Sequence, residues 1–396
     1  MESLSRRIAR STRAIEFDAI PAAVIARVKL GLLDLLSCVY EAKNDFHLPG
    51  DAGTAFTLGV LGHGLVREDM HTGAVSHLGV VIYPALLELA QSRSVAGRNF
   101  IRAVACGYEA GAAIGRALVR DPEFVQFHRP TGTTGPIGAA VAGSLLLGLD
   151  ENALVSAIGL AANTASGLNE WPYSGADDMF YHPGFAARNA VTCVELASLG
   201  ACGSESSLDG RAGLFASLHR PAPDIELFRD SRWEILDVYY KPFAACNYAQ
   251  TPCQAAEALK PVSRIRRIDV RCSAAAAAYP GCDYSGPCLT TLQAKMSIQH
   301  CVAKTLGDDS LAALITVESA DEFTAAYPEK QGAEVSVTLD NGERRTKRLD
   351  DLIPATEQQI RGRFRAVCPN AGELEHFVDT LEFTADIRPL TSSFKD

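Results

Sequence analysis

The sequence lacks a long apolar run, because no stretch of about 18 or more consecutive apolar residues occurs in it. We therefore expect no membrane span. An excess of basic charge is also missing, since 47 acidic residues outnumber 37 lysines and arginines and give a formal net charge of −10. Nucleic acid is not expected as a partner, because binding its phosphates needs a basic surface. A local basic pocket for a small anion stays compatible with this charge.

Paired cysteine motifs are absent as well. Eleven cysteines are scattered along the chain, with no C-x-x-C pair and no spacing typical of a zinc site. The first residues, MESLSRRIARSTRAIEF, are too charged for a secretory signal. We therefore expect reduced thiols in a cytoplasmic protein rather than a disulfide framework.

Strand patterns are nearly missing from the first half, where apolar residues recur at helical spacing. After about Trp233, alternating patterns begin, one at 264–272 and two that flank a turn signal within 335–348. A helical pattern returns over 354–381. We therefore predict a mainly α fold, with a large helical domain built from both chain ends and a smaller inserted α+β lid. The expected parts are 1–235 (helical domain), 236–350 (lid) and 351–396 (return to the helical domain).

One stretch, FHRPTGTTGPIGAA at 127–140, combines His128 with a Pro/Gly/Thr cluster that opens an apolar helix. A helix N-terminus suits an anion, and a histidine just upstream could move a proton on a bound carboxylate. A capped turn with a hydrogen-bonded histidine is the alternative interpretation of the same residues.

A second polar stretch, REDMHTGAVSHLG at 67–79, holds Asp69, His71 and His77 between two apolar segments. Ionisable groups in such a place need either hydrogen-bonded partners or a function. The side chains could cap and lie at the surface, or both histidines could reach the same cleft as His128. Metal binding is a third interpretation. His63, in a small apolar helix predicted over 54–66, is expected to be a packing residue.

Motifs in matching order along most of the chain resemble those of the 2-methylcitrate dehydratase (MmgE/PrpD) family. They are the polar run at 69–77, G-Y-E at 107–109, the F-H-P-T-G-T-like stretch at 127–133, H-P-G-F-A-A-R-N at 182–189, G-R-A-G-L-F at 210–215, K-P-F with Cys246 at 241–246, and K-M-S-I at 295–298. The resemblance implies a helical domain with an α+β lid, an active site in the cleft between them and a homodimer. It also implies that no metal or organic cofactor is needed.

The shared chemistry of that family is movement of a proton next to a carboxylate, followed by loss of water, loss of carbon dioxide or inversion. On this resemblance His77 and His128 are expected to act as base and acid, with Asp69 orienting His71. Lys241 is expected to bind a carboxylate of the small acid substrate, and His300 to donate a proton from the lid. The residues expected to contact the substrate are Asp69, Thr131, Thr133, Met179, Cys246 and Gln250.

The sequence also departs from the family pattern. Met70 stands where a threonine is usual, Met179 where a lysine is usual, His300 where a tyrosine is usual and Gln250 where a histidine is frequent. Losing a lysine removes one partner for a carboxylate, so the substrate should carry fewer carboxylates or bind differently. Three functions stay open: a lyase acting on a small carboxylic acid, an isomerase or epimerase of a specialised pathway, and a member that only binds.

Overall fold

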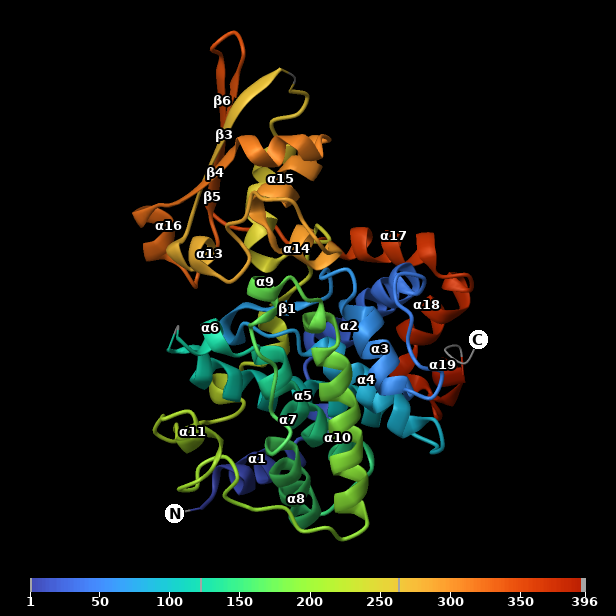
Figure 1. The fold of residues 1–396 in the computed structure, drawn as a ribbon. Helices are drawn as coiled ribbons and strands as arrows, with labels where there is room; N and C mark the ends of the chain where they lie inside the picture. The colour runs from blue at the N-terminus through green and yellow to red at the C-terminus, as the bar shows by residue number, and fades with distance from the viewer. Residues whose placement is uncertain (1, 122, 263, 393–396) are drawn as a thin grey trace.

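The structure is a computed structural model that describes residues 2–121, 123–262 and 264–392. Figure 1 shows a large helical body and a smaller part that carries a β-sheet above it. Buried apolar side chains form a separate large cluster in each. The fold is mainly helical, as the sequence predicts, whereas the exact division at 235/236 and 350/351 stays a prediction. No helix of the described residues is long and apolar enough to cross a bilayer.

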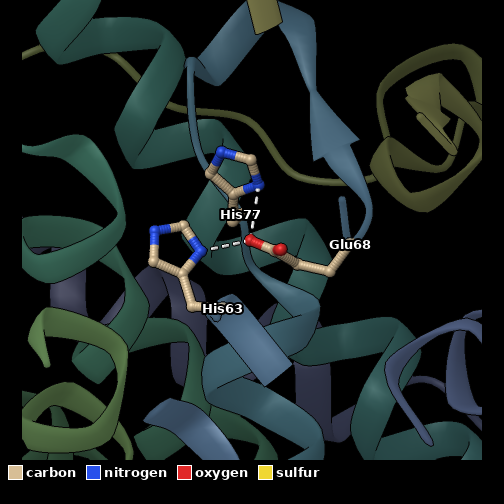
Figure 2. Close-up of side chains that lie close together, drawn as sticks. All are labelled: His63, Glu68 and His77. Carbon is tan, nitrogen blue, oxygen red and sulfur yellow. Dashed lines mark hydrogen bonds and ion pairs between the residues drawn. The ribbon is translucent and has the colours of Figure 1, made fainter. Parts of the chain in front are cut away.

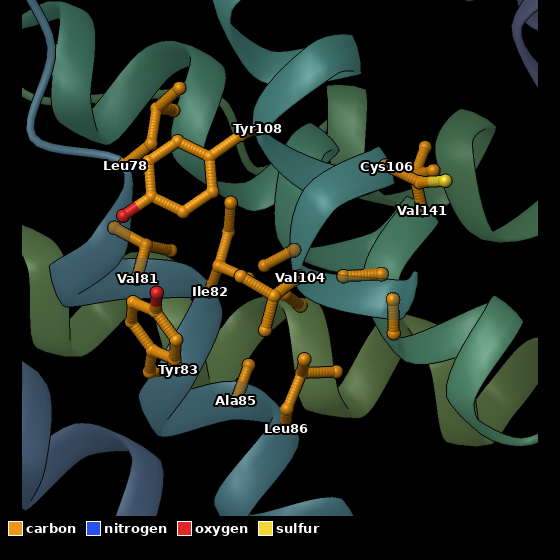
Figure 3. Packing of buried hydrophobic residues seen from close by; sticks show 14 of the residues in the cluster. Leu78, Val81, Ile82, Tyr83, Ala85, Leu86, Val104, Cys106, Tyr108 and Val141 are labelled. Carbon is orange, nitrogen blue, oxygen red and sulfur yellow. The ribbon is translucent and has the colours of Figure 1, made fainter. Parts of the chain in front are cut away.

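The helical body is built around two packed helices, α5 and α7. Small residues allow their close contact: a Cβ atom on Gly138 of α7 would lie 2.8 Å from the carbonyl oxygen of Gly107 in α5. Figure 3 shows Ile82 of α4 facing Val104 and Tyr108 of α5 in the same core. The helices of this body are α1 (Leu4–Arg13), α2 (Ala22–Ala42), α3 (Thr54–His63), α4 (Gly79–Ala90), α5 (Gly97–Val119), α6 (Phe124–Phe127), α7 (Pro130–Leu146), α8 (Glu151–Ala162), α10 (His182–Ser198) and α11 (Leu214–Ser217).

The C-terminal segment returns to this body, as predicted. Phe364, Val378 and Leu390 are fully buried in the same cluster as the N-terminal helices. The segment forms α17 (Glu357–Val367), α18 (Ala371–Asp379) and α19 (Arg388–Ser392). A core made of both chain ends explains why the α+β part appears as an insertion between them.

The α+β part contains a four-stranded sheet with the order β4-β3-β5-β6, in which β3 runs parallel to β4 and antiparallel to β5. The predicted hairpin is confirmed, with Gly342 at φ +85° in its turn. Its strands are β3 (Ile265–Cys272), β4 (Ile315–Ser319), β5 (Ala333–Leu339) and β6 (Arg344–Leu349). Its helices are α12 (Gln250–Glu257), α13 (Ala274–Ala278), α14 (Thr291–Met296), α15 (Ile298–Leu306) and α16 (Asp321–Ala326).

Two details differ from the sequence predictions. The nearly strand-free first half contributes β1 (Met70–His71), which pairs antiparallel with β2 (Val238–Tyr239). The apolar helical pattern of residues 291–306 forms two helices instead of one, because the Ser297 hydroxyl accepts a hydrogen bond from the backbone N–H of His300 and so starts a new helix. Between the two parts lies α9 (Trp171–Ser174), whose Trp171 is buried in the cluster of the α+β part.

Candidate functional site

A carboxylate between two imidazoles lies in the interior, below the α+β part. His63 ends α3, Glu68 follows in the next loop, and His77 precedes α4. Figure 2 shows both rings directed at one carboxylate oxygen. Glu68 Oε1 accepts a hydrogen bond from His63 Nδ1 and lies 3.0 Å from His77 Nδ1. The exposed fractions of the three residues are 0%, 1% and 3%, so water does not compete for these contacts.

The hydrogen bonds determine which ring nitrogens carry protons. Arg129 Nη2 lies 3.1 Å from His63 Nε2, and because arginine can only donate, this nitrogen of His63 accepts. His77 Nδ1 lies 2.9 Å from the carbonyl oxygen of Asp69, which can only accept, so His77 carries its proton on Nδ1. Among the described residues nothing hydrogen-bonds to His77 Nε2. That lone pair is therefore free to take a proton.

Burial sets the charges of this cluster. It lowers the pKa of His77 to about 3, helped by the Lys241 charge and opposed by Glu68. Burial also lowers the pKa of His63. For Glu68, burial acts in the opposite direction, but the contacts with both histidines hold its pKa well below the ordinary value. The resting cluster is therefore an ionised carboxylate beside two neutral imidazoles.

Two buried cations border the cluster without a carboxylate partner. Lys241 is 0% exposed, and its Nζ donates to the carbonyl oxygens of Val66 at 2.7 Å and Ala245 at 3.5 Å. Arg129 is 4% exposed, with Nη1 3.5 Å from the Tyr279 hydroxyl and Nε without a partner. Within the described ranges, no acidic side chain lies within ion-pair distance of either cation. Burying a cation without an anion is costly, so this arrangement suits an acidic ligand.

Comparison with known proteins shows which proteins this part of the chain is similar to. Residues 51–225, which include His63, Glu68, His77 and Arg129, match the MmgE/PrpD N-terminal domain. The chain thus contains an MmgE/PrpD N-terminal domain. It is 23% identical to the cis-aconitate decarboxylase of Aspergillus terreus over 451 residues, which cover 94% of this chain and 92% of that protein. It is 24% identical to the cis-aconitate decarboxylase-like protein oryM of Aspergillus oryzae over 458 residues, covering 94% and 93%.

Several residues predicted from the family resemblance lie at this site. Besides His77 and Lys241, Thr131 is present, and its hydroxyl accepts the backbone N–H of His77 at 3.1 Å. Cys246 is buried next to Cys282, with 3.5 Å between the sulfurs. Burial opposes ionisation of Cys246, but the hydrogen bond with Cys282 and the charge of Lys241 lower its pKa to about 7.

Three other predicted substrate contacts have structural partners. The Gln250 amide donates to the carbonyls of residues 243, 245 and 246 and accepts from the N–H of residue 243, so it shapes the loop after Lys241. Thr133 donates to the Arg129 carbonyl at 3.2 Å within α7. Met179 is 0% exposed in the apolar cluster of the α+β part. Substrate contact by these residues stays a prediction.

The structure does not bring His128 to His77, so the expected shared cleft is wrong for these two side chains. The His128 ring stacks on Phe124 with 5.1 Å between ring centroids and lines a surface cavity of about 330 Å³ with Arg220. The cause is local geometry. His128 and Arg129 have extended backbone angles, and in an extended segment successive side chains point to opposite sides. The residue that points inward is Arg129.

The expected orientation of His71 by Asp69 is also wrong. Asp69 accepts a hydrogen bond from the Tyr108 hydroxyl of α5. His71 Nε2 instead lies 2.8 Å from Glu234, which Arg116 holds in place through its own ion pair. Each group is therefore satisfied by a helix or loop far away in sequence.

His300 lies in the α+β part, outside the imidazole cluster. Its Nε2 donates to the Gly286 carbonyl at 2.8 Å, and its ring stacks on Tyr284 with 6.3 Å between centroids. It lines a cavity of about 550 Å³ together with Lys295 and Phe243. Its expected role as a proton donor from the lid stays a prediction.

Sequence reasoning missed Glu68, Arg129 and the polar role of His63. The polar run at 67–79 contained a signal for Glu68, which precedes Asp69 directly. A signal for Arg129 was also present. The family motif F-H-P-T-G-T has its histidine directly before the proline, whereas this chain has one extra residue, Arg129, between His128 and Pro130. His63 offered no such signal, because its apolar neighbours predict a packed helix.

Among the described residues, two groups of side chains have ligand atoms close enough together to hold a metal ion. They are His63, Glu68 and His77, and separately His71, Glu234 and Asp237. In the first group, Arg129 and Lys241 would repel a divalent cation, whereas in the second, Arg116 already pairs with both acids. These charges favour an anion at the first group. The expectation that the protein needs no metal stays a prediction.

Asp69→Asn should change how stability depends on pH. Burial raises the pKa of Asp69 to about 7 from an ordinary 3.8, so the folded state holds a proton that the unfolded state releases. This contribution is complete below about pH 4 and is lost as the pH rises to about 7, by at most about 1.4 kcal/mol per pH unit. The stability advantage of wild type over Asp69→Asn should therefore shrink across this range. Urea unfolding at several pH values measures it, and a constant difference would contradict the assignment.

Proposed function

We propose that this chain is a lyase-type enzyme that moves a proton next to a carboxylate of a small acid, without a metal or an organic cofactor. Dehydration or decarboxylation completes the reaction. The observation that carries the proposal is the free Nε2 of His77, supported by an ionised Glu68 and close to an unpaired, buried Lys241. The match to the MmgE/PrpD N-terminal domain and the likeness to proteins named cis-aconitate decarboxylase support the same chemistry.

In the proposed reaction, Lys241 binds a substrate carboxylate and stabilises the charge that develops on it when the neighbouring carbon loses a proton. His77 Nε2 takes that proton, and Glu68 stabilises the imidazolium that forms. The electrons of the C–H bond then form a double bond as hydroxide leaves the next carbon, and the proton held by His77 passes to that hydroxide to give water. In a decarboxylation, His77 first takes up a proton from solvent; carbon dioxide then leaves, and protonated His77 gives that proton to the carbanion.

Binding of the acid also adjusts the base. The pKa of His77 is about 3 in the unliganded site, too low for an efficient base at neutral pH. A substrate carboxylate beside Lys241 offsets the cation that depresses this pKa. The base should therefore become stronger when substrate is bound.

Because the groups of the cluster are at most 4% exposed, substrate access needs movement of the covering segments. Tyr279 and Cys246 belong to the cluster of the α+β part, whereas His63, His77 and Arg129 come from the helical body. Separation of the two parts would open the site. The closed arrangement then excludes water during the reaction.

Isomerisation or epimerisation remains the alternative, because it uses the same proton step without loss of a group. A protein that binds the acid without catalysis is the third possibility.

The test is to incubate the protein in heavy water with a panel of small carboxylic acids. The panel contains hydroxy acids, unsaturated acids and amino acids in which two or more carbon atoms separate the polar groups. Deuterium uptake with loss of water or carbon dioxide supports a lyase, and uptake alone supports an isomerase. Binding of an acid without any uptake would overturn the enzymatic proposal.

Lys241→Met should weaken binding of the acid by about 10- to 100-fold, because a charge-assisted hydrogen bond in a buried site is lost. Lys241 lowers the pKa of His77, so the acid limb of the pH–rate profile should also move to higher pH in this variant. Steady-state kinetics that extend from about pH 9 down to about pH 3, as far as the fold allows, would measure both effects. Lys295→Met, which removes a lysine that lines the 550 Å³ cavity and lies outside the imidazole cluster, is the matched control and should leave that acid limb in place.

A further inference from the structure

We propose that Arg129 binds a second carboxylate of the substrate, so that the substrate is a small dicarboxylic acid held between Arg129 and Lys241. This inference rests on the proposed function for the role of Lys241. It adds the substrate class and a residue that determines specificity. Arg129 is an extra residue between the His and the Pro of the F-H-P-T-G-T-like stretch, so the inference concerns this chain rather than the family pattern.

The contacts of Arg129 leave its charge uncompensated. Its Nη2 donates to neutral His63, its Nη1 reaches the Tyr279 hydroxyl at 3.5 Å, and its Nε is buried without a hydrogen-bond partner. A guanidinium group offers five N–H donors in a planar fork that matches a carboxylate. A bound carboxylate would supply the acceptor that Nε lacks.

Two cations of the cluster have no acidic partner among the described residues, and their number, rather than the net charge of the cluster, indicates how many acidic groups the site can take. Lys241 and Arg129 carry two positive charges, and Glu68 carries one negative charge that both imidazoles already share. Neither cation is paired with an acid in the described part of the chain. One carboxylate for each cation is the simplest way to compensate both.

The surrounding backbone is shaped to admit the guanidinium. The Arg129 N–H donates to the carbonyl of Gly167 at 2.9 Å, which aligns the two segments. Gly167 has φ +109°, and a Cβ atom there would lie 3.2 Å from Arg129 Cβ and 3.3 Å from His182 Nδ1. A side chain at 167 would therefore be strained and would crowd Arg129. His182 Nδ1 is itself buried without a partner, so it is a second polar atom at this position that can contact a ligand.

This arrangement revises the expectation drawn from Met179. A methionine in place of a lysine removes one cation, which predicted a substrate with fewer carboxylates. Arg129 adds a cation at another place, between His128 and Pro130. A substrate with two carboxylates in a changed relative position fits both departures.

The test is calorimetric binding of malonate, succinate and glutarate, each compared with its monoamide, which removes one negative charge at nearly constant shape. Wild type should bind one of these diacids about 10- to 100-fold more tightly than its monoamide. Arg129→Gln should abolish this preference, and Arg129→Lys, which keeps the charge but not the fork, should retain part of it. Arg220→Gln, at the surface cavity beside His128, is the matched control and should keep the whole preference.

The outcomes separate this inference from the proposed function. If folded Arg129→Gln prefers the diacid as wild type does, or if wild type shows no preference for any diacid, the inference is overturned, whatever the exchange experiment shows. If the preference depends on Arg129 but no acid takes up deuterium, the inference stands and the catalytic proposal fails. Should Arg129→Gln not fold, an Arg129→Lys variant with undiminished preference and affinity would count against a bidentate contact and overturn the inference.

Discussion

His77→Asn is expected to lower turnover by about 10²- to 10⁴-fold, which is the usual contribution of a general base. Asparagine can keep a hydrogen bond to the Asp69 carbonyl, but it has no basic nitrogen at the position of Nε2. Folding should be preserved, because the residue is polar, of moderate size and still partnered. The rate of deuterium uptake into the substrate would measure the loss directly.

His128→Asn is the matched control for this variant. Its ring lies in a surface cavity beside Phe124, away from Glu68, so we expect turnover close to wild type. Equal losses in both variants would contradict the assignment of the base. A loss confined to His128→Asn would restore the interpretation drawn from the sequence, in which this histidine acts on the substrate.

Glu68→Gln is expected to be the second most damaging change, with a loss of about 10³-fold, inside the usual range for general base catalysis. This is smaller than the roughly 10⁴-fold loss when the carboxylate of a serine-protease triad becomes an amide. The amide cannot stabilise the imidazolium that forms when His77 takes a proton. Glu68 raises the pKa of His77, so its removal should shift the acid limb of the pH–rate profile to lower pH while reducing the plateau. Kinetics measured across that limb would separate the two effects.

Glu234→Gln provides a matched comparison, because Glu234 also contacts a buried histidine, His71. That pair lies next to Arg116, outside the cluster of Glu68, and it is not assigned to the reaction. Its loss should leave turnover near wild type once folding has been verified by circular dichroism. A large loss of activity in folded Glu234→Gln, with little loss in Glu68→Gln, would transfer the functional role to His71.

Much of the architecture could be read from local patterns. Helical spacing over the first 230 residues, alternation at β3 and the turn signal around Gly342 depend on contacts near in sequence, and these predictions are confirmed. The break at Ser297 was harder to see, because a serine inside an apolar helical pattern is tolerated unless its hydroxyl caps a new helix. The pairing of β1 with β2 joins segments about 168 positions apart, which no local pattern reveals.

For the candidate site, too, some features could be predicted from the sequence and others only from the structure. The amino-acid order was enough to indicate the resemblance to the family and the chemical type of the residues, and to predict roles for His77 and Lys241. Only the folded chain shows that His63, Glu68 and Arg129 surround them, and that His128 and His71 face other partners. The physical reason is that side-chain direction depends on backbone angles and on distant helices. The side chain of His128 points to the surface and that of the next residue, Arg129, points to the interior. Neither composition nor residue spacing predicts which of the two points inward.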